Sequence, residues 1–256
     1  MKGNWSKIVK KFGVNLVLGI LLLLGITGCE KPEDRSCFKS SGSYAELQIP
    51  LDSIRHFDFG DRIKYRIYQD NYNKMIIKGG KNLIQNIDVQ NRDNVLYIDN
   101  NNSCRFLRNS PDIVEVEIHY PYMKSFFMDV SDSVIFMDKI KAYSLVVEMR
   151  NGGGSLKADV DVHKISMVVS HGAGDFTLSG KADEAELKIQ NNGAANAINF
   201  RSEYVYIYQN STANMFINLD GSSALIYIDG TGNVFYGNEA GNIEREGVGE
   251  GQIIKL

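Results

Sequence analysis

The stretch KISMVVSHGAGDFTLS, residues 164–179, contains the pattern that decides the fold. Ile165, Met167 and Val169 recur at every second position, which predicts a strand with one buried face. The strand is followed by a corner at residues 171–175, where Gly172 and Gly174 can adopt the positive φ angles that tight turns need. The stretch therefore predicts a short strand that ends in a glycine-rich turn.

The same unit of strand and turn recurs through the second half of the chain. The expected strands are residues 145–149, 165–169, 185–189, 204–208 and 224–228. The Gly/Asn/Asp-rich corners are residues 151–154, 171–175, 192–195, 211–214, 229–233 and 247–251. A fixed period of about 20 residues is typical of a solenoid, in which each coil completes its core only by stacking on its neighbours. We predict an all-β, β-helix-like solenoid of stacked two-stranded coils with glycine-rich turns.

The first half of the chain is also strand-like, although it shows no clear repeat. In residues 62–68, Ile63, Tyr65 and Ile67 alternate with basic residues, and residues 114–118 show the same alternation with glutamates. Residues 79–84 predict either a short helix or a turn. We therefore expect one β-solenoid domain over residues 44–256.

The N-terminus has the features of an export signal. Four lysines precede an apolar stretch at residues 12–24, which is too short to span a bilayer comfortably. The following Ile26-Thr27-Gly28-Cys29 resembles the bacterial lipobox. We predict that residues 1–28 are a lipoprotein signal peptide and that Cys29 carries the lipid that attaches the protein to the outer membrane. The alternative is an uncleaved N-terminal anchor helix.

Residues 29–43 are polar and predict a flexible tether between the lipid and the domain. Their acidic residues, Glu30, Glu33 and Asp34, fit either a signal for export to the cell surface or an ordinary solvated linker. Two further cysteines, Cys37 and Cys104, would form a disulfide in an oxidising compartment. Two buried free thiols are the alternative.

Composition and motifs argue against several functions. The formal charge is −3 for the whole chain, and removal of four signal-peptide lysines makes it about −7, so we expect no nucleic-acid partner. HExxH, GxSxG and P-loop motifs are missing from the sequence, and we expect no catalytic residues, no cofactor and no metal. His171 is interpreted as a polar corner residue rather than as a base or ligand.

Aspartates leave an enzymatic alternative open, because β-helix lyases and hydrolases assemble sites from residues that are distant in sequence. Two sets could converge across coils: Asp129, Asp132 and Asp138, or Asp159, Asp161 and Asp175. The competing interpretation is that these acids are solvated and blunt exposed strand edges.

Aromatic residues indicate a candidate binding face. Strand alternation in residues 204–208 turns Val205 and Ile207 inward, so Tyr204, Tyr206 and Tyr208 face outward. Phe216 and Tyr227 have the corresponding outward phase in later coils. These five residues could bind sugar rings or a partner protein, or they could form a ladder that only stabilises neighbouring strands.

In its order of motifs the chain resembles the head GIN domain family of auto-transporter adhesins, common among Bacteroidetes lipoproteins. The similar segments are residues 57–61, 104–108, 116–121, 170–175 and 230–237. The resemblance implies a stack of two sheets meeting at glycine turns and an adhesive role, with no catalytic residues to transfer. The sequence departs from the glycine pattern at residues 192–195 and 211–214, where we expect wider or looser corners.

We therefore expect a cell-envelope lipoprotein, held by its lipid and exposed on the cell surface or facing the periplasm. Its predicted role is non-catalytic adhesion or ligand binding, with a glycan or a host or cell-surface protein as partner. A polysaccharide-processing β-helix lyase or hydrolase is the alternative.

Overall fold

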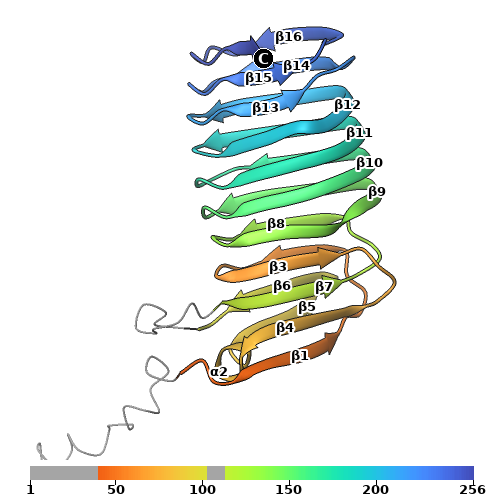
Figure 1. Ribbon diagram of the computed structural model, residues 1–256, viewed down its shortest axis with the longest axis vertical. Helices are drawn as coiled ribbons and strands as arrows, with labels where there is room; N and C mark the ends of the chain where they lie inside the picture. The colour runs from red at the N-terminus through yellow and green to blue at the C-terminus, as the bar shows by residue number, and fades with distance from the viewer. Residues whose placement is uncertain (1–39, 103–112) are drawn as a thin grey trace, which may run out of the picture. The chain divides into compact units, whose positions relative to one another are not determined.

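The computed structural model describes residues 40–102 and 113–256, which form a β-solenoid of about seven turns (Figure 1). The predicted fold class is therefore confirmed. The predicted signal peptide, Cys29, Cys37 and Cys104 lie outside the described residues.

The strands form two long ladders, which we call face A and face B. Face A contains, in spatial order, β5 (Ile87–Arg92), β6 (Val95–Asn100), β2 (His56–Phe59), β8 (Ser125–Asp129), the second halves of β9 (Ser133–Asn151), β10 (Ser155–Val169), β11 (Asp175–Asn191) and β12 (Ala194–Ser211), then β14 (Ser223–Ile228) and β16 (Asn242–Glu246). Face B contains β1 (Tyr44–Pro50), β4 (Lys74–Gly80), β7 (Val114–His119), β3 (Ile63–Tyr68), the first halves of β9 to β12, β13 (Met215–Asn218), β15 (Val234–Gly237) and β17 (Ile253–Lys255). Neighbouring strands are parallel, except where β5 meets β6, β4 meets β7 and β1 meets β4.

Strands β9 to β12 differ from the predicted pairs of short strands, because each continues from face B to face A without a break. The pairing of β10 with β11 extends from Ser155 opposite Asp175 to Val169 opposite Ile189. A strand that bends keeps its backbone groups hydrogen-bonded to the coils on either side, whereas a second tight turn would leave the ladder. Each of these coils therefore has one tight corner and one bent corner.

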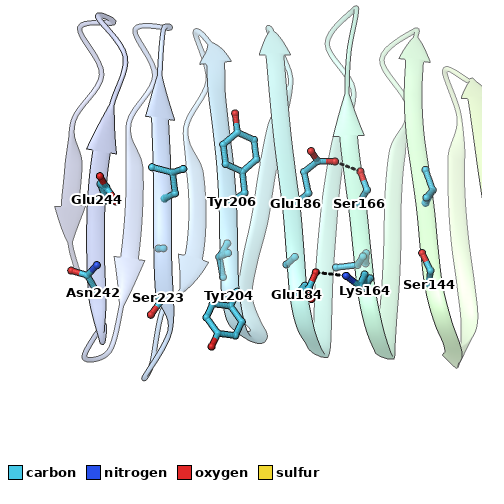
Figure 2. Close-up of a pocket in the computed structure, with 16 residues that line it drawn as sticks. Ser144, Lys164, Ser166, Glu184, Glu186, Tyr204, Tyr206, Ser223, Asn242 and Glu244 are labelled. Carbon is cyan, nitrogen blue, oxygen red and sulfur yellow. Dashed lines mark hydrogen bonds and ion pairs between the residues drawn. The ribbon is translucent and has the colours of Figure 1, made fainter.

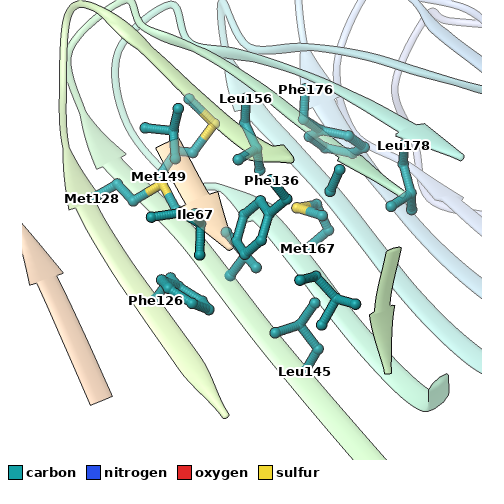
Figure 3. Packing of buried hydrophobic residues seen from close by; sticks show 14 of the residues in the cluster. Ile67, Phe126, Met128, Phe136, Leu145, Met149, Leu156, Met167, Phe176 and Leu178 are labelled. Atoms are coloured by element: carbon teal, nitrogen blue, oxygen red, sulfur yellow. The ribbon is translucent and has the colours of Figure 1, made fainter. Parts of the chain in front are cut away.

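The core lies between the two faces and is filled by the inward residues of every coil (Figure 3). Ile165, Met167 and Val169 are buried, as their alternation predicts, and so are Val205 and Ile207. Toward the N-terminal coils the core becomes aromatic. There, the rings of Phe57 and Phe126 stack at 4.7 Å between centroids, and those of Phe59 and Tyr65 stack at 4.1 Å.

The coil made of β2 and β3 is out of sequence order. Strand β2 pairs with both β6 and β8, and β3 pairs with both β7 and β9. In Figure 1 the orange strand β3 accordingly lies between yellow-green β7 and the green strands β8 and β9. Strands β2 and β3 come first in the chain, and the later strands β6 to β9 pair with them on both sides.

Charge explains why β7 separates β3 from β4. The outward residues of β3 and β4 are mostly basic, whereas β7 presents Glu115 and Glu117 between them. Arg66 on β3 contacts Glu115 at 2.9 Å, and Lys78 on β4 contacts Glu117 at 2.8 Å. Direct pairing of β3 with β4 would instead place like charges side by side, which is unfavourable.

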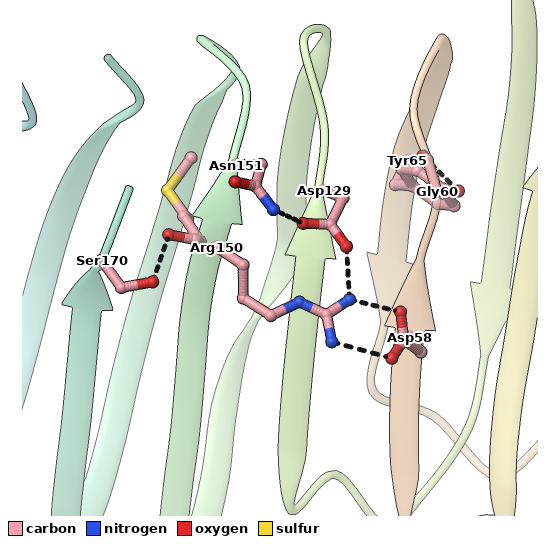
Figure 4. A network of polar contacts seen from close by, with 8 residues as sticks. Asp58, Gly60, Tyr65, Asp129, Arg150, Asn151 and Ser170 are labelled. Carbon is pink, nitrogen blue, oxygen red and sulfur yellow. Dashed lines mark hydrogen bonds and ion pairs between the residues drawn. The ribbon is translucent and has the colours of Figure 1, made fainter. Parts of the chain in front are cut away.

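On face A, Arg150 binds the coil that contains β2 and β3 through hydrogen bonds (Figure 4). Its guanidinium group donates hydrogen bonds to both carboxylate oxygens of Asp58 on β2, at 2.7 and 3.1 Å. It also donates to Asp129 on β8 at 2.6 Å, and it lies 5.8 Å from the centre of the Phe127 ring. One side chain on β9 thereby links three successive coils.

Two corners that lack the glycine pattern are not wider or looser, contrary to our prediction. At the first, Asn191 has a positive φ of 59°, and the Gly193 amide donates to the Gln190 carbonyl at 3.0 Å, which closes a tight turn. At the second, buried Gln209 donates to the Ala213 carbonyl at 2.7 Å. Side-chain hydrogen bonds thus support a corner that glycine forms elsewhere.

Residues 79–84, where a helix or a turn was expected, contain the short helix α2 (Lys81–Ile84), which buries Leu83 and Ile84. The carbonyls of Ser41 and Ser43 accept hydrogen bonds from the amides of Asn82 and Lys81. The last residues of the predicted tether are therefore already attached to the domain. Within residues 40–102 and 113–256, no helix is long and apolar enough to cross a membrane.

Candidate ligand-binding groove

Face A carries a groove because its parallel strands are in register, so outward side chains align in rows across the coils. The first row contains Ser144, Lys164, Glu184, Tyr204, Ser223 and Asn242. The second row, two residues further along each strand, contains Val146, Ser166, Glu186, Tyr206, Leu225 and Glu244. Both rows line one shallow groove of about 680 Å³ (Figure 2).

The floor of the groove, between the two rows, is the backbone at Ile165, Ala185, Val205 and Ala224, because their side chains point into the core and are almost fully buried. The apolar side chains that face the groove are Val146 and Leu225 of the second row, beside the two tyrosine rings.

Two of the three carboxylates of the groove, those of Glu184 and Glu186, are held by hydrogen bonds. Lys164 donates to Glu184 at 2.6 Å, and this contact raises the pKa of the lysine. Glu186 accepts a hydrogen bond from Ser166 at 2.5 Å and contacts Lys188 at 2.6 Å. Burial alone would raise the pKa of Glu186, but the hydrogen bonds from Lys188 and Ser166 outweigh it and lower the pKa.

This electrostatic arrangement bears on catalysis. A glycosidase needs one carboxylic acid that stays protonated near neutral pH, so the pKa of that acid must be raised. Glu186 has the opposite shift, because its neighbours stabilise the ionised form. The groove therefore presents Glu186 as a fixed hydrogen-bond acceptor rather than as a proton donor.

Two of the five aromatic residues predicted to bind line the groove. Tyr204 is 61% exposed, and Tyr206 is partly exposed with Lys188 Nζ 5.6 Å from its ring centre. Tyr208 and Tyr227 lie one row beyond the groove and pack together at 5.7 Å between ring centroids. These four tyrosines share face A.

Phe216 belongs to the other face, so the single aromatic surface predicted from the sequence is wrong at this position. It faces outward on β13, where it stacks on Phe235 of β15 at 5.1 Å. The outward phase of Phe216 matches that of Tyr227, but the chain has passed the corner at residues 211–214 between Tyr208 and Phe216. The alternation of inward and outward residues along a strand does not tell whether the strand belongs to face A or to face B.

The aspartates considered for an enzymatic site are dispersed and individually partnered. Asp129 binds Arg150, Asp138 accepts from the Gln69 amide at 3.1 Å, and Asp175 accepts from Ser155 at 2.6 Å. Lysines lie close to two more of the six carboxylates, with Lys139 at 3.4 Å from Asp159 and Lys181 at 3.6 Å from Asp161. Among the described residues, no group of three or more His, Cys, Asp or Glu side chains could hold a metal ion.

Sequence reasoning missed the polar residues of the groove. Lys164, Glu184 and Tyr204 are exactly one coil apart in the chain, as are Ser166, Glu186 and Tyr206. Alignment of the coils at their period would have placed these residues in two rows. The aromatic side chains attracted attention because they are unusual residues, whereas isolated serines and glutamates are common on any strand.

The fold and the register of its strands define a β-solenoid with a groove across face A. The family model described as "Putative auto-transporter adhesin, head GIN domain" matches residues 56–240. The chain belongs to this family, as its motifs indicated. No curated protein matches it.

Solved structures from Bacteroidetes have the same fold. A putative adhesin from Bacteroides fragilis has a TM-score of 0.75 and 19% identity, covering 84% of this chain and 97% of its own. A putative adhesin from Parabacteroides distasonis has a TM-score of 0.60 and 14% identity, covering 84% and 98%. A putative lipid binding protein from Parabacteroides distasonis has a TM-score of 0.63 and 16% identity, covering 85% and 98%. At these identities the similarity establishes the fold.

Proposed function

We propose that this protein is a non-catalytic adhesin of the cell envelope that binds an external glycan in the groove of face A. Membership of an adhesin family supports a role at the envelope or cell surface. We further propose that Cys29 carries a lipid that anchors the protein in the outer membrane, with the binding domain beyond the tether.

The observation that carries the proposal is the composition of the groove. The exposed rings of Tyr204 and Tyr206 offer flat faces to the C–H surfaces of sugars. The Tyr206 ring also lies beside Lys188. The side chains of Ser144, Ser223 and Asn242 make no hydrogen bonds within the described part of the chain, so they can bind sugar hydroxyls.

Two observations favour binding over the alternatives. The lowered pKa of Glu186 is unsuited to a general acid of a polysaccharide hydrolase. The space between the two faces is filled by buried side chains, so a lipid acyl chain would have to bind outside the core. A surface groove suits a polymer that passes over several coils.

The test compares Tyr204→Ala with Tyr122→Ala on a glycan array and a panel of surface proteins. Tyr122 is 77% exposed and lies outside the groove, which makes it a matched control. Loss of an exposed tyrosine that anchors a ligand should cost about 1 kcal/mol or more, or roughly fivefold in affinity. Neither change should shift folding stability by more than about 0.5 kcal/mol, because both side chains are on the surface.

The proposal is supported if a glycan binds the wild type and Tyr122→Ala with equal affinity, binds Tyr204→Ala more weakly, and is recovered uncleaved. Cleaved products would instead identify the protein as a polysaccharide-processing enzyme. If every ligand bound both variants equally, the groove would not be the binding site.

A further inference from the structure

The groove runs across the strands rather than along them. Its lining comes from six neighbouring strands of face A, namely β9, β10, β11, β12, β14 and β16. Neighbouring strands lie about 4.8 Å apart, so the five steps between them span roughly 24 Å. Figure 2 shows the two rows of side chains following this direction.

The repeat of the groove matches the repeat of a linear polysaccharide. A pyranose unit in an extended, equatorially linked chain is about as long as the distance between two strands. A glycan lying along the stack would therefore place successive sugars over successive coils. In the first row it would meet Ser144, Lys164, Glu184, Tyr204, Ser223 and Asn242 in turn.

The charges of the groove oppose an anionic ligand. Lys164 and Lys188 are each engaged by a carboxylate at 2.6 Å, from Glu184 and Glu186 respectively. Among the described residues that line the groove, Lys164 is the one basic residue, against Glu184, Glu186 and Glu244, whereas Lys188 lies one row beyond, in a row that also contains Glu148 and Glu246. Glu244 forms no ion pair within the described part of the chain, so negative charge is in excess. A uronic acid or a sulfated sugar would have to approach this charge without a free cation to bind it.

We infer that the groove binds an uncharged, linear glycan, with one sugar over each strand and about six sugars in contact, as the strand spacing sets. The inference rests on the proposed function and adds the direction, the length and the charge of the ligand. Tyr204 and Tyr206 lie over the middle of this path, where stacking would contribute most.

The test uses linear β-linked glucan, mannan and xylan fragments, from disaccharide to octasaccharide, beside oligogalacturonates and sulfated fragments of the same lengths. Binding to the purified full-length protein is measured at low and high salt. Affinity for at least one neutral series should rise with each added sugar up to about six units and then stay constant. Anionic fragments should bind at least about tenfold more weakly at low salt, and salt should narrow that difference.

A charge reversal provides the second measurement. Glu244→Lys should raise the ratio of anionic to neutral binding, because it converts the excess negative charge into a positive one. Glu46→Lys makes the same change in net charge on β1 of face B, outside the groove, and should leave that ratio unchanged.

Three results would overturn the inference: tighter binding of anionic fragments by the wild type, affinity that does not depend on length, or no neutral fragment that depends on Tyr204. If Tyr204→Ala lost affinity for a short or an anionic glycan that the wild type binds, the proposed function would survive and only the inference would fail. If it lost affinity only for a protein ligand, the groove would remain the binding site, but both the glycan proposal and the inference would fail. Unchanged binding of every ligand by Tyr204→Ala would remove both.

Discussion

Gly180 offers a sharp test of how closely the coils are stacked. It lies where β11 bends, and its φ of 95° is in the region that side chains rarely adopt. A Cβ atom added there would lie 2.0 Å from the carbonyl oxygen of Val160 in the preceding coil. Alanine at position 180 therefore meets two separate penalties, one from backbone conformation and one from steric overlap.

Other glycines separate the two penalties. Gly221 has a φ of 69° but nothing within 4 Å of a new Cβ. Gly232 does not have a positive φ, yet its Cβ would lie 1.9 Å from the Ala213 carbonyl oxygen. Gly153 has neither problem and serves as the control.

The expected losses follow from these environments. A left-handed residue costs about 1–2 kcal/mol, which applies to Gly221→Ala. Overpacking costs about 1–3 kcal/mol, which applies to Gly232→Ala. Gly180→Ala combines both and should lose about 3 kcal/mol or more, whereas Gly153→Ala should change stability by less than about 0.5 kcal/mol.

Thermal unfolding followed by circular dichroism measures the series. For a domain of this size, 1 kcal/mol corresponds to about 2–4 °C, so Gly180→Ala should unfold at least about 6 °C below wild type. A Gly180→Ala protein as stable as Gly221→Ala would refute the reasoning, because the contact with the neighbouring coil would then contribute nothing.

Three further changes test other parts of the molecule. Glu117→Lys should destabilise the fold by about 2 kcal/mol, a value between those for surface and buried ion pairs, because it places a third cation beside Lys78 and Arg66. Denaturant titration measures the change in the free energy of unfolding. A loss below about 0.5 kcal/mol would contradict the explanation of the strand order by charge. The folded pKa of Glu186 lies below its ordinary value of 4.5, so its stabilisation is present above that value and disappears as the pH falls through the folded pKa. In the Glu186→Gln variant, the melting temperature should fall less steeply below pH 4.5 than in the wild type. The difference should be small because the Glu186 side chain is 39% exposed. Identical curves of melting temperature against pH would show that ionised Glu186 does not stabilise the fold. Cys29→Ala should leave an unprocessed, unlipidated precursor by intact mass, and normal maturation would exclude the lipoprotein assignment.

The fold of the second half was predictable because its information is local and repeated. Alternation assigned Val205 and Ile207 to the core, and the spacing of the glycine corners gave the coil length. The bent corners were not predicted, because residues 180–183 continue the ladder although their sequence, Gly-Lys-Ala-Asp, resembles a turn. Phe216 was assigned to the wrong surface for a related reason, because a period of two cannot show on which face a strand lies.

The order of the first coils could not be predicted from local patterns. That β2 and β3 lie between β6–β7 and β8–β9 depends on contacts between distant residues, such as Arg150 with Asp58 and Arg66 with Glu115. The alternating charges were visible in the sequence, but they became informative only once the neighbouring strands were known. The groove was half predicted, through Tyr204 and Tyr206, and its polar partners required the register.

The displaced coil makes the two ends of the stack respond differently to mechanical load. Beyond β9, every coil pairs only with the coils before and after it, so tension at the C-terminal end can peel coils away one at a time. Strands β2 and β3 are clasped from both sides by later parts of the chain, and neither can leave before two ladders break together. In the proposed adhesin, pulled between its ligand and its lipid anchor, the most tear-resistant coils would lie toward the N-terminal end of the described domain.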